Sequence, residues 1–208
     1  MFKPMALVAA SAVLLATTAC VVQDKKNGNG DNVRIHTPVG GMEVHTNDVH
    51  PADVGLPVYQ GATLAPTDKH DNDKSADIDM SFGEWHLRVK VIGYTSTDPQ
   101  DKVVAYYKKA LQRYGDVLTC QDSKPVGTPV KTSEGLTCTN DARYNIDLDV
   151  NTTSGSAKVK TPALSSDGFE LRAGSPTEQH IVAFSAVSGT GSKFALINVE
   201  LPHKQETN

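Results

Sequence analysis

Apolar and polar residues alternate along much of the chain after residue 32, which is the pattern of strands with one buried face. Two segments alternate on both sides of a turn and predict hairpins: "VRIHTPVGGMEVHTN", turning at "PVGG", and "DIDMSFGEWHLRVKVIGY", turning at Gly83. Strands are also predicted at "DVLTC", "GLTCTN" and "YNIDLDV", and three more follow at "FELRAG", "HIVAFSAV" and "KFALINVEL".

The first hairpin is predicted to carry one apolar and one polar face. A four-residue loop at "PVGG" sets Ile35 opposite Val44 and His36 opposite Glu43. The apolar face then holds Val33, Ile35, Met42 and Val44, and the polar face holds Arg34, His36, Glu43 and His45.

The polar face of this hairpin is a candidate metal site. Side chains that are cross-strand neighbours lie about 5 Å apart at Cβ, so His36, Glu43 and His45 could converge on Zn²⁺ or Cu²⁺, with His50 as a fourth ligand. The alternative is a solvated polar face with a His–Glu pair.

One helix is predicted in "TDPQDKVVAYYKKALQRYG", over about residues 98–114. Pro99 suits the first turn, Val103 and Tyr107 recur at helical spacing, and Gly115 ends the helix. One helix among about nine strands favours an α+β fold, in which an antiparallel β-sheet packs against this helix and the chain begins with the N-terminal β-hairpin. A pure sandwich is the rival fold.

The N-terminal segment "MFKPMALVAASAVLLATTAC" has the pattern of a secretory signal peptide. Lys3 precedes an apolar run over residues 5–16, which is shorter than the roughly 20 residues of a membrane-spanning helix. The segment resembles a bacterial lipoprotein signal that is cleaved before a lipidated cysteine, here Cys20. Thr17 stands where the lipobox usually has leucine.

This resemblance implies a lipid anchor in the bacterial cell envelope. Val21 follows the cysteine instead of the aspartate that is associated with inner-membrane retention, which favours the outer membrane. The expected organisation is a signal peptide over 1–19, a lipidated cysteine with a flexible tether over 20–32, and a single domain over 33–204.

Cys120 and Cys138 are predicted to form a disulfide, because compartments outside the cytoplasm are oxidising. They lack the C-x-x-C spacing of redox motifs. The segment between them is rich in Pro, Gly, Ser, Thr and Lys and has little to bury. A cross-link over a loop of this length contributes about 3 kcal/mol in the simple chain-entropy picture.

Composition and motifs point away from nucleic acid and from known catalytic signatures. Removing residues 1–19 takes away one lysine and no acidic residue, so the net charge changes from −4 to −5, and no basic cluster stands out. G-x-S-x-G, S-x-x-K and H-E-x-x-H do not occur. No cofactor is expected.

Three blocks, "LPVYQGATL", "YTSTDPQDKVVAYYKKALQRYG" and "ELRAGSPTEQHIVAF", resemble segments of uncharacterised bacterial envelope proteins and imply no catalytic residue. The resulting hypothesis is a non-catalytic, lipid-anchored envelope protein that binds a partner protein or supports an assembly. The alternatives are a lipoprotein that binds a metal or small ligand through the histidine hairpin, and an enzyme with an unrecognised site.

Overall fold

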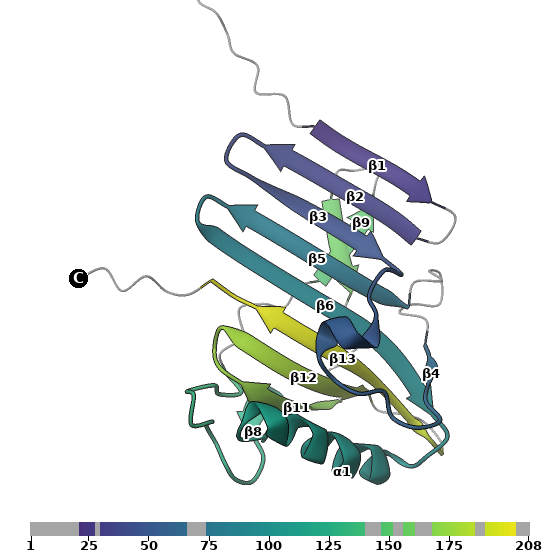
Figure 1. The fold of residues 1–208 in the computed structure, drawn as a ribbon, viewed down its shortest axis with the longest axis vertical. Coiled ribbons are helices and arrows are strands. Elements are labelled where there is room, and N and C mark those ends of the chain that lie inside the picture. The colour runs from purple at the N-terminus through teal and green to yellow at the C-terminus, as the bar shows by residue number, and fades with distance from the viewer. Residues whose placement is uncertain are drawn as a thin grey trace, which may run out of the picture.

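Most of the described chain forms one antiparallel sheet of 11 strands (Figure 1). The computed structural model describes residues 21–27, 30–65, 74–139, 147–151, 156–160, 168–185 and 190–202. The predicted signal peptide and Cys20 lie outside the described residues. The strand order is β1-β2-β3-β5-β6-β13-β12-β11-β7-β8, and β4 pairs with β6.

The strands of this sheet are β1 (Val21–Asn27), β2 (Gly30–Thr37), β3 (Gly40–Thr46), β4 (Thr63–Leu64), β5 (Ser75–Phe82), β6 (Trp85–Ser96), β7 (Leu118–Gln121), β8 (Lys124–Pro125), β11 (Phe169–Gly174), β12 (Glu178–Ser185) and β13 (Ser192–Glu200). Two further strands, β9 (Asp147–Asn151) and β10 (Ser156–Lys160), form a separate pair. The helical elements are η1 (Pro51–Val54), α1 (Gln100–Leu111) and η2 (Gln112–Tyr114).

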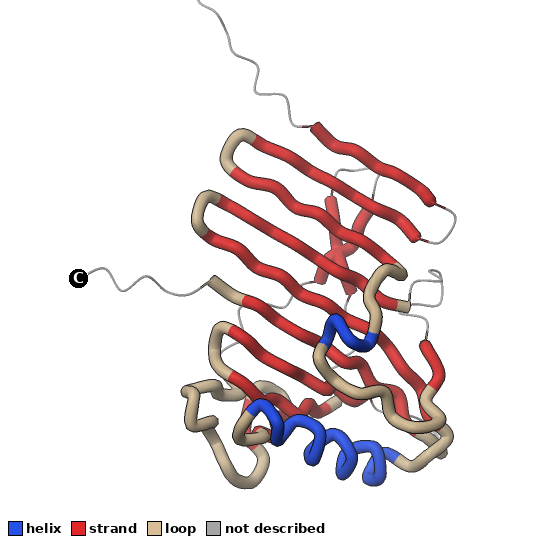
Figure 2. Tube along the Cα trace, viewed as in Figure 1, coloured by secondary structure: helices blue, strands red, loops and turns tan. Residues whose placement is uncertain are grey.

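The predicted antiparallel sheet and main helix are therefore confirmed, and the fold is more strongly dominated by strands than the α+β prediction suggested (Figure 2). Helix α1 buries Val103, Tyr107 and Leu111 at the predicted helical spacing. It crosses one face of the sheet at the β6, β13, β12 and β11 end, where these side chains join Phe184, Phe194 and other sheet residues in a core.

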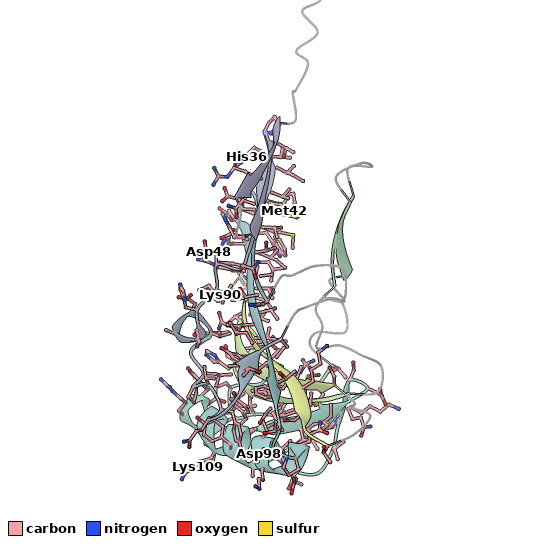
Figure 3. All side chains as sticks on the ribbon, turned by 90° about the vertical axis from the view of Figure 1, so that its right-hand side faces the viewer. His36, Met42, Asp48, Lys90, Asp98 and Lys109 are labelled. Carbon is pink, nitrogen blue, oxygen red and sulfur yellow. A yellow bond between two sulfur atoms is a disulfide. The ribbon has the colours of Figure 1, made fainter. Side chains whose placement is uncertain are left out.

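The two faces of the sheet differ because successive side chains along a strand alternate in direction. On β6, Ile92 and Tyr94 belong to the core under α1, whereas Leu87, Val89 and Val91 belong to a second apolar cluster. We call these two sides the helix face and the far face. The far-face cluster runs across the sheet from Val33 on β2 to Ile181 on β12. It therefore includes strands that α1 does not cover on the other face (Figure 3).

Two predictions about the N-terminal hairpin need correction. Thr37 pairs with Gly40, so the loop is the two residues Pro38 and Val39, not four, and Arg34 instead of His36 stands opposite Glu43. The register shift is two residues, which preserves the side-chain faces, and the predicted apolar and polar sets are confirmed.

The segment that we predicted as a tether also differs from the prediction. Val21–Asn27 forms β1 and pairs with β2 in the register Val21↔His36 to Asn27↔Gly30. Only two residues separate these strands in the sequence. The sheet therefore begins directly after Cys20 in the sequence.

Cys120 and Cys138 form the predicted disulfide, with 5.6 Å between their Cα atoms. Both cysteines are buried and pack with Leu118 and Leu136 in a small cluster of their own. The first cysteine lies on β7, as expected, but the predicted strand at "GLTCTN" is wrong, because its described residues contribute only the isolated bridge between Lys131 and Thr137.

Among the described residues, no helix has the length and apolar character needed to span a membrane.

Candidate functional site: a polar panel on the sheet

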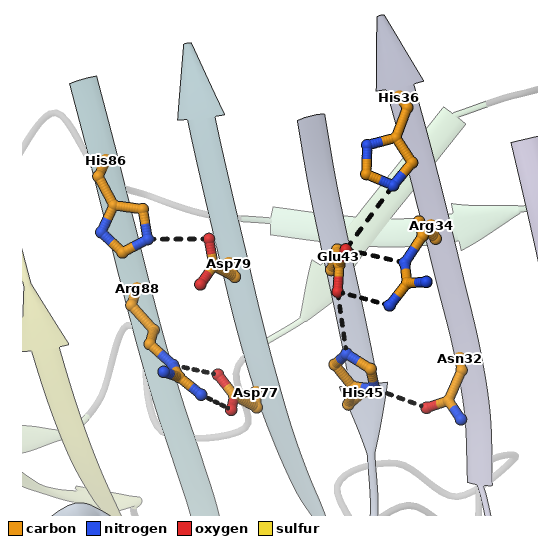
Figure 4. A network of polar contacts seen from close by, with 9 residues as sticks. All are labelled: Asn32, Arg34, His36, Glu43, His45, Asp77, Asp79, His86 and Arg88. Atoms are coloured by element: carbon orange, nitrogen blue, oxygen red, sulfur yellow. Dashed lines mark hydrogen bonds and ion pairs between the residues drawn. The ribbon is translucent and has the colours of Figure 1, made fainter. Parts of the chain in front are cut away.

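The helix face carries a network of polar side chains on β2, β3, β5 and β6, beside the part of the sheet that α1 covers (Figure 4). We call this network the polar panel. His36 on the panel and Met42 point to opposite sides of the sheet (Figure 3). The panel consists of Asn32, Arg34, His36, Glu43, His45, Asp77, Asp79, His86 and Arg88.

Glu43 is the most heavily contacted member of the panel. Arg34, directly opposite on β2, binds both of its carboxylate oxygens, with Nε at 2.8 Å from Oε1 and Nη2 at 3.0 Å from Oε2. His36 Nε2 lies 3.7 Å from Oε1, and His45 Nε2 lies 3.5 Å from Oε2. The hydrogen bond from Arg34 lowers the pKa of Glu43, and contact with His45 adds to this effect.

A second group of contacts joins β5 to β6. Arg88 binds Asp77 with two hydrogen bonds, at 3.1 Å from Nε and 2.7 Å from Nη2, and this contact raises the pKa of Arg88. His86 Nε2 lies 2.9 Å from Asp79 Oδ1. Both contacts are diagonal, because Arg88 stands opposite Asp79.

The two groups meet where Glu43 stands opposite Asp79 across β3 and β5. Like charges in directly opposite positions destabilise a sheet. This repulsion is offset by Arg34, which stands opposite Glu43 on β2, and by Arg88, which stands opposite Asp79 on β6. With neutral histidines, the two arginines and three carboxylates leave the panel with a net charge of −1.

The panel is open to solvent, since its paired side chains are between 17% and 53% exposed. It therefore presents charges that are already held in place on neighbouring strands. An exposed, preorganised arrangement of this kind suits recognition of a complementary charged surface.

The geometry does not fit the metal site predicted at His36, Glu43 and His45. In the predicted register a histidine faced Glu43, but the observed register places Arg34 there, and the guanidinium takes both carboxylate oxygens and adds positive charge. His50 precedes η1, and its backbone N–H donates to Asp53. Within the described part of the chain, no group of three or more His, Cys, Asp or Glu residues has the arrangement to hold a metal ion.

Sequence reasoning missed five members of the panel: Asn32, which it assigned to the tether, and the four residues Asp77, Asp79, His86 and Arg88 of the second hairpin. The alternation of these four residues with Ile78, Leu87 and other apolar residues of the second hairpin placed them on its polar face. The missing information was the pairing of β3 with β5, which brings the polar faces of the two hairpins together.

Two buried polar groups lie elsewhere in the sheet. Arg172 and Glu170 on β11 form an ion pair on the far face, with side chains only 6% and 11% exposed. On the helix face, His180 stacks on Tyr114 with ring centroids 3.5 Å apart, and its Nδ1–H donates to the Val54 carbonyl at 3.1 Å. Burial lowers the pKa of His180.

Comparison with known proteins does not identify a family for this chain. No protein-family model, curated protein or solved structure matches the chain.

Proposed function

We propose that this protein is a lipid-anchored binding module of the bacterial cell envelope that recognises a partner protein through the polar panel and catalyses no reaction. The N-terminal signal pattern and Cys20 support the anchor, and Val21 after the cysteine favours the outer membrane. The disulfide between Cys120 and Cys138 is consistent with an oxidising compartment.

The observation that carries the binding proposal is the preorganisation of the panel. Each of two arginines contacts both oxygens of a carboxylate, on strands that are linked through β3 and β5: Arg88 by two hydrogen bonds, and Arg34 by one hydrogen bond and one ion pair. Fixing side chains before binding reduces the entropy that association costs. Arginine in this geometry also keeps donors free for a partner, because its guanidinium carries five N–H groups.

The partner that suits this surface is an envelope protein whose contact area also carries both charge signs. Positive and negative groups alternate over the panel, so a correct partner must match their order as well as their number. Electrostatic matching of this kind contributes more to the choice of partner than to the strength of binding.

A photo-crosslinking experiment in cells tests the panel. We would place a photoreactive phenylalanine analogue at Ser81, an exposed residue between the two hairpins, and at Lys109 on the outer side of α1 as a control. The proposal expects one discrete crosslinked protein from position 81 and none from position 109. Equal crosslinking from both positions, or none from position 81, would contradict it.

A charge swap separates recognition from stability. Arg34→Glu together with Glu43→Arg retains an internal ion pair and reverses its direction. The swapped protein is expected to keep the melting temperature of the wild type within about 3 °C, since an exposed pair contributes about 1 kcal/mol or less. It is also expected to lose the crosslink from position 81, and a retained crosslink would show that the partner does not recognise the panel.

A further inference from the structure

Two hairpin turns lie side by side at one end of the sheet. Pro38 and Val39 connect β2 to β3, and Gly83 and Glu84 connect β5 to β6. The turns are joined by a hydrogen bond from the Gly83 N–H to the Val39 carbonyl at 3.2 Å. They therefore form one continuous edge of the molecule (Figure 1).

This edge exposes large apolar side chains. Val39 is 74% exposed and Phe82 is 51% exposed. The Phe82 ring lies 6.0 Å from the ring of Trp85, which is itself partly exposed. We call these three residues the hairpin edge.

The exposed ring of Phe82 is held in place by the close approach of Gly40. A Cβ at position 40 would lie 2.6 Å from Phe82 Cδ1 and 2.2 Å from the Ser81 carbonyl oxygen, so only glycine allows this packing. The ring is fixed against the neighbouring strand on one side and open to its surroundings on the other. Exposed apolar groups that are held in this way are typical of contact surfaces.

The chain reaches Cys20 from the same end of the sheet. Val21, the first residue of β1, pairs with His36. His36 is the second-to-last residue of β2, and the turn that contains Val39 follows this strand. Strands lie about 4.8 Å apart, so β1 and the β5 end of the hairpin edge are separated by about 15 Å. A lipid attached at Cys20 would enter the membrane within that distance of Val39 and Phe82.

We infer that the hairpin edge rests in the interfacial layer of the membrane, beside the acyl chains of Cys20. This inference depends on the lipid anchor of the proposed function. Tryptophan favours the interface between lipid headgroups and acyl chains, because its ring is large and apolar and its indole N–H can still reach a polar partner. Phenylalanine can bury its apolar ring in the same layer. Glu84 at the same edge opposes attraction to anionic headgroups, so the contact is with the apolar part of the interface.

The contact would determine how the protein stands on the membrane. A lipid alone leaves the protein free to tilt on the membrane. A lipid together with the hairpin edge gives two neighbouring points of contact, which fix the orientation of the sheet relative to the membrane. The strands of β2, β3, β5 and β6 then run away from the bilayer, and the polar panel stands beside the membrane instead of against it. This orientation leaves the panel accessible to a partner protein.

Fluorescence of Trp85 tests the inference, because the chain contains one tryptophan. Full-length protein extracted from membranes would be reconstituted into phosphatidylcholine vesicles with acyl chains brominated near the headgroup, and into unbrominated vesicles. The inference expects bromine to quench at least half of the emission. It also expects Val39→Asp, alone or with Phe82→Asp, to remove most of the quenching.

Val126→Asp with Val130→Asp is the matched control. These residues are 52% and 58% exposed in the disulfide loop, and their substitution is expected to leave the quenching unchanged. Equal loss of quenching in the control would contradict the inference, since it would show that the effect is not specific to the hairpin edge.

Mass spectrometry and flotation of the same samples distinguish the possible failures. Acylated protein that floats with the vesicles but shows no bromine quenching would overturn the membrane contact and leave the anchor intact. Blue-shifted emission without quenching would mean that protein, not lipid, covers the edge. Protein without acyl mass would overturn both the anchor and the inference.

Discussion

The buried pair Glu170–Arg172 gives the sharpest prediction about stability. Arg172 Nη2 lies 2.5 Å from Glu170 Oε1, and both side chains are almost fully buried. Burial raises the pKa of Glu170 to about 7 and lowers the pKa of Arg172 to about 10. Both groups are therefore charged at pH 8.

Glu170→Gln keeps the shape of the side chain and removes its charge. Arg172 then stays charged at a buried position and loses its ion pair with Glu170. Removing one member of a buried pair costs about 3–5 kcal/mol, a large part of the 5–15 kcal/mol that stabilises a typical domain. Replacing both residues, as Glu170→Leu with Arg172→Met, removes both charges and is expected to cost much less than the two single substitutions together.

Urea denaturation at pH 8, followed by far-UV circular dichroism and Trp85 fluorescence, measures these free energies of unfolding. Glu43→Gln is the control, because Glu43 pairs with Arg34 at an exposed position and its loss should cost about 1 kcal/mol or less.

A cost below about 1 kcal/mol for Glu170→Gln, with additive single and double substitutions, would refute this reasoning.

Three further predictions concern the core. Burial lowers the pKa of His180, so the wild type should lose stability relative to His180→Gln as the pH falls below about 6.5, in melting curves at pH 7.5 and pH 5. Tyr107→Phe should cost about 1 kcal/mol in urea titrations, because the Tyr59 N–H loses its acceptor at 3.1 Å. Alanine at both Cys120 and Cys138 should cost about 3 kcal/mol, and added reductant should then have no further effect.

Local patterns in the sequence predicted the parts of the fold that depend on periodicity. The faces of the hairpin around Val39 followed from alternation, because shifting the register by two residues leaves every side chain on its original face. Helix α1 followed from the spacing of Val103 and Tyr107 and from Pro99 at its start.

Contacts between distant segments were not predictable in this way. The register of the first hairpin depended on whether the turn used two or four residues of "PVGG", and that choice decided whether His36 or Arg34 met Glu43. The polar panel further depends on β3 pairing with β5 across a long connection. The buried position of His180 likewise depends on Val54, which lies 126 residues away in the sequence.

The lipid anchor at Cys20 can be tested by the intact mass of the non-reduced protein extracted from membranes. We expect a chain that begins at Cys20, carries the added mass of acyl chains, and is lighter by two hydrogens for the disulfide. A chain that retains residues 1–19 without acyl mass would contradict the anchor, the envelope location and the orientation of the hairpin edge.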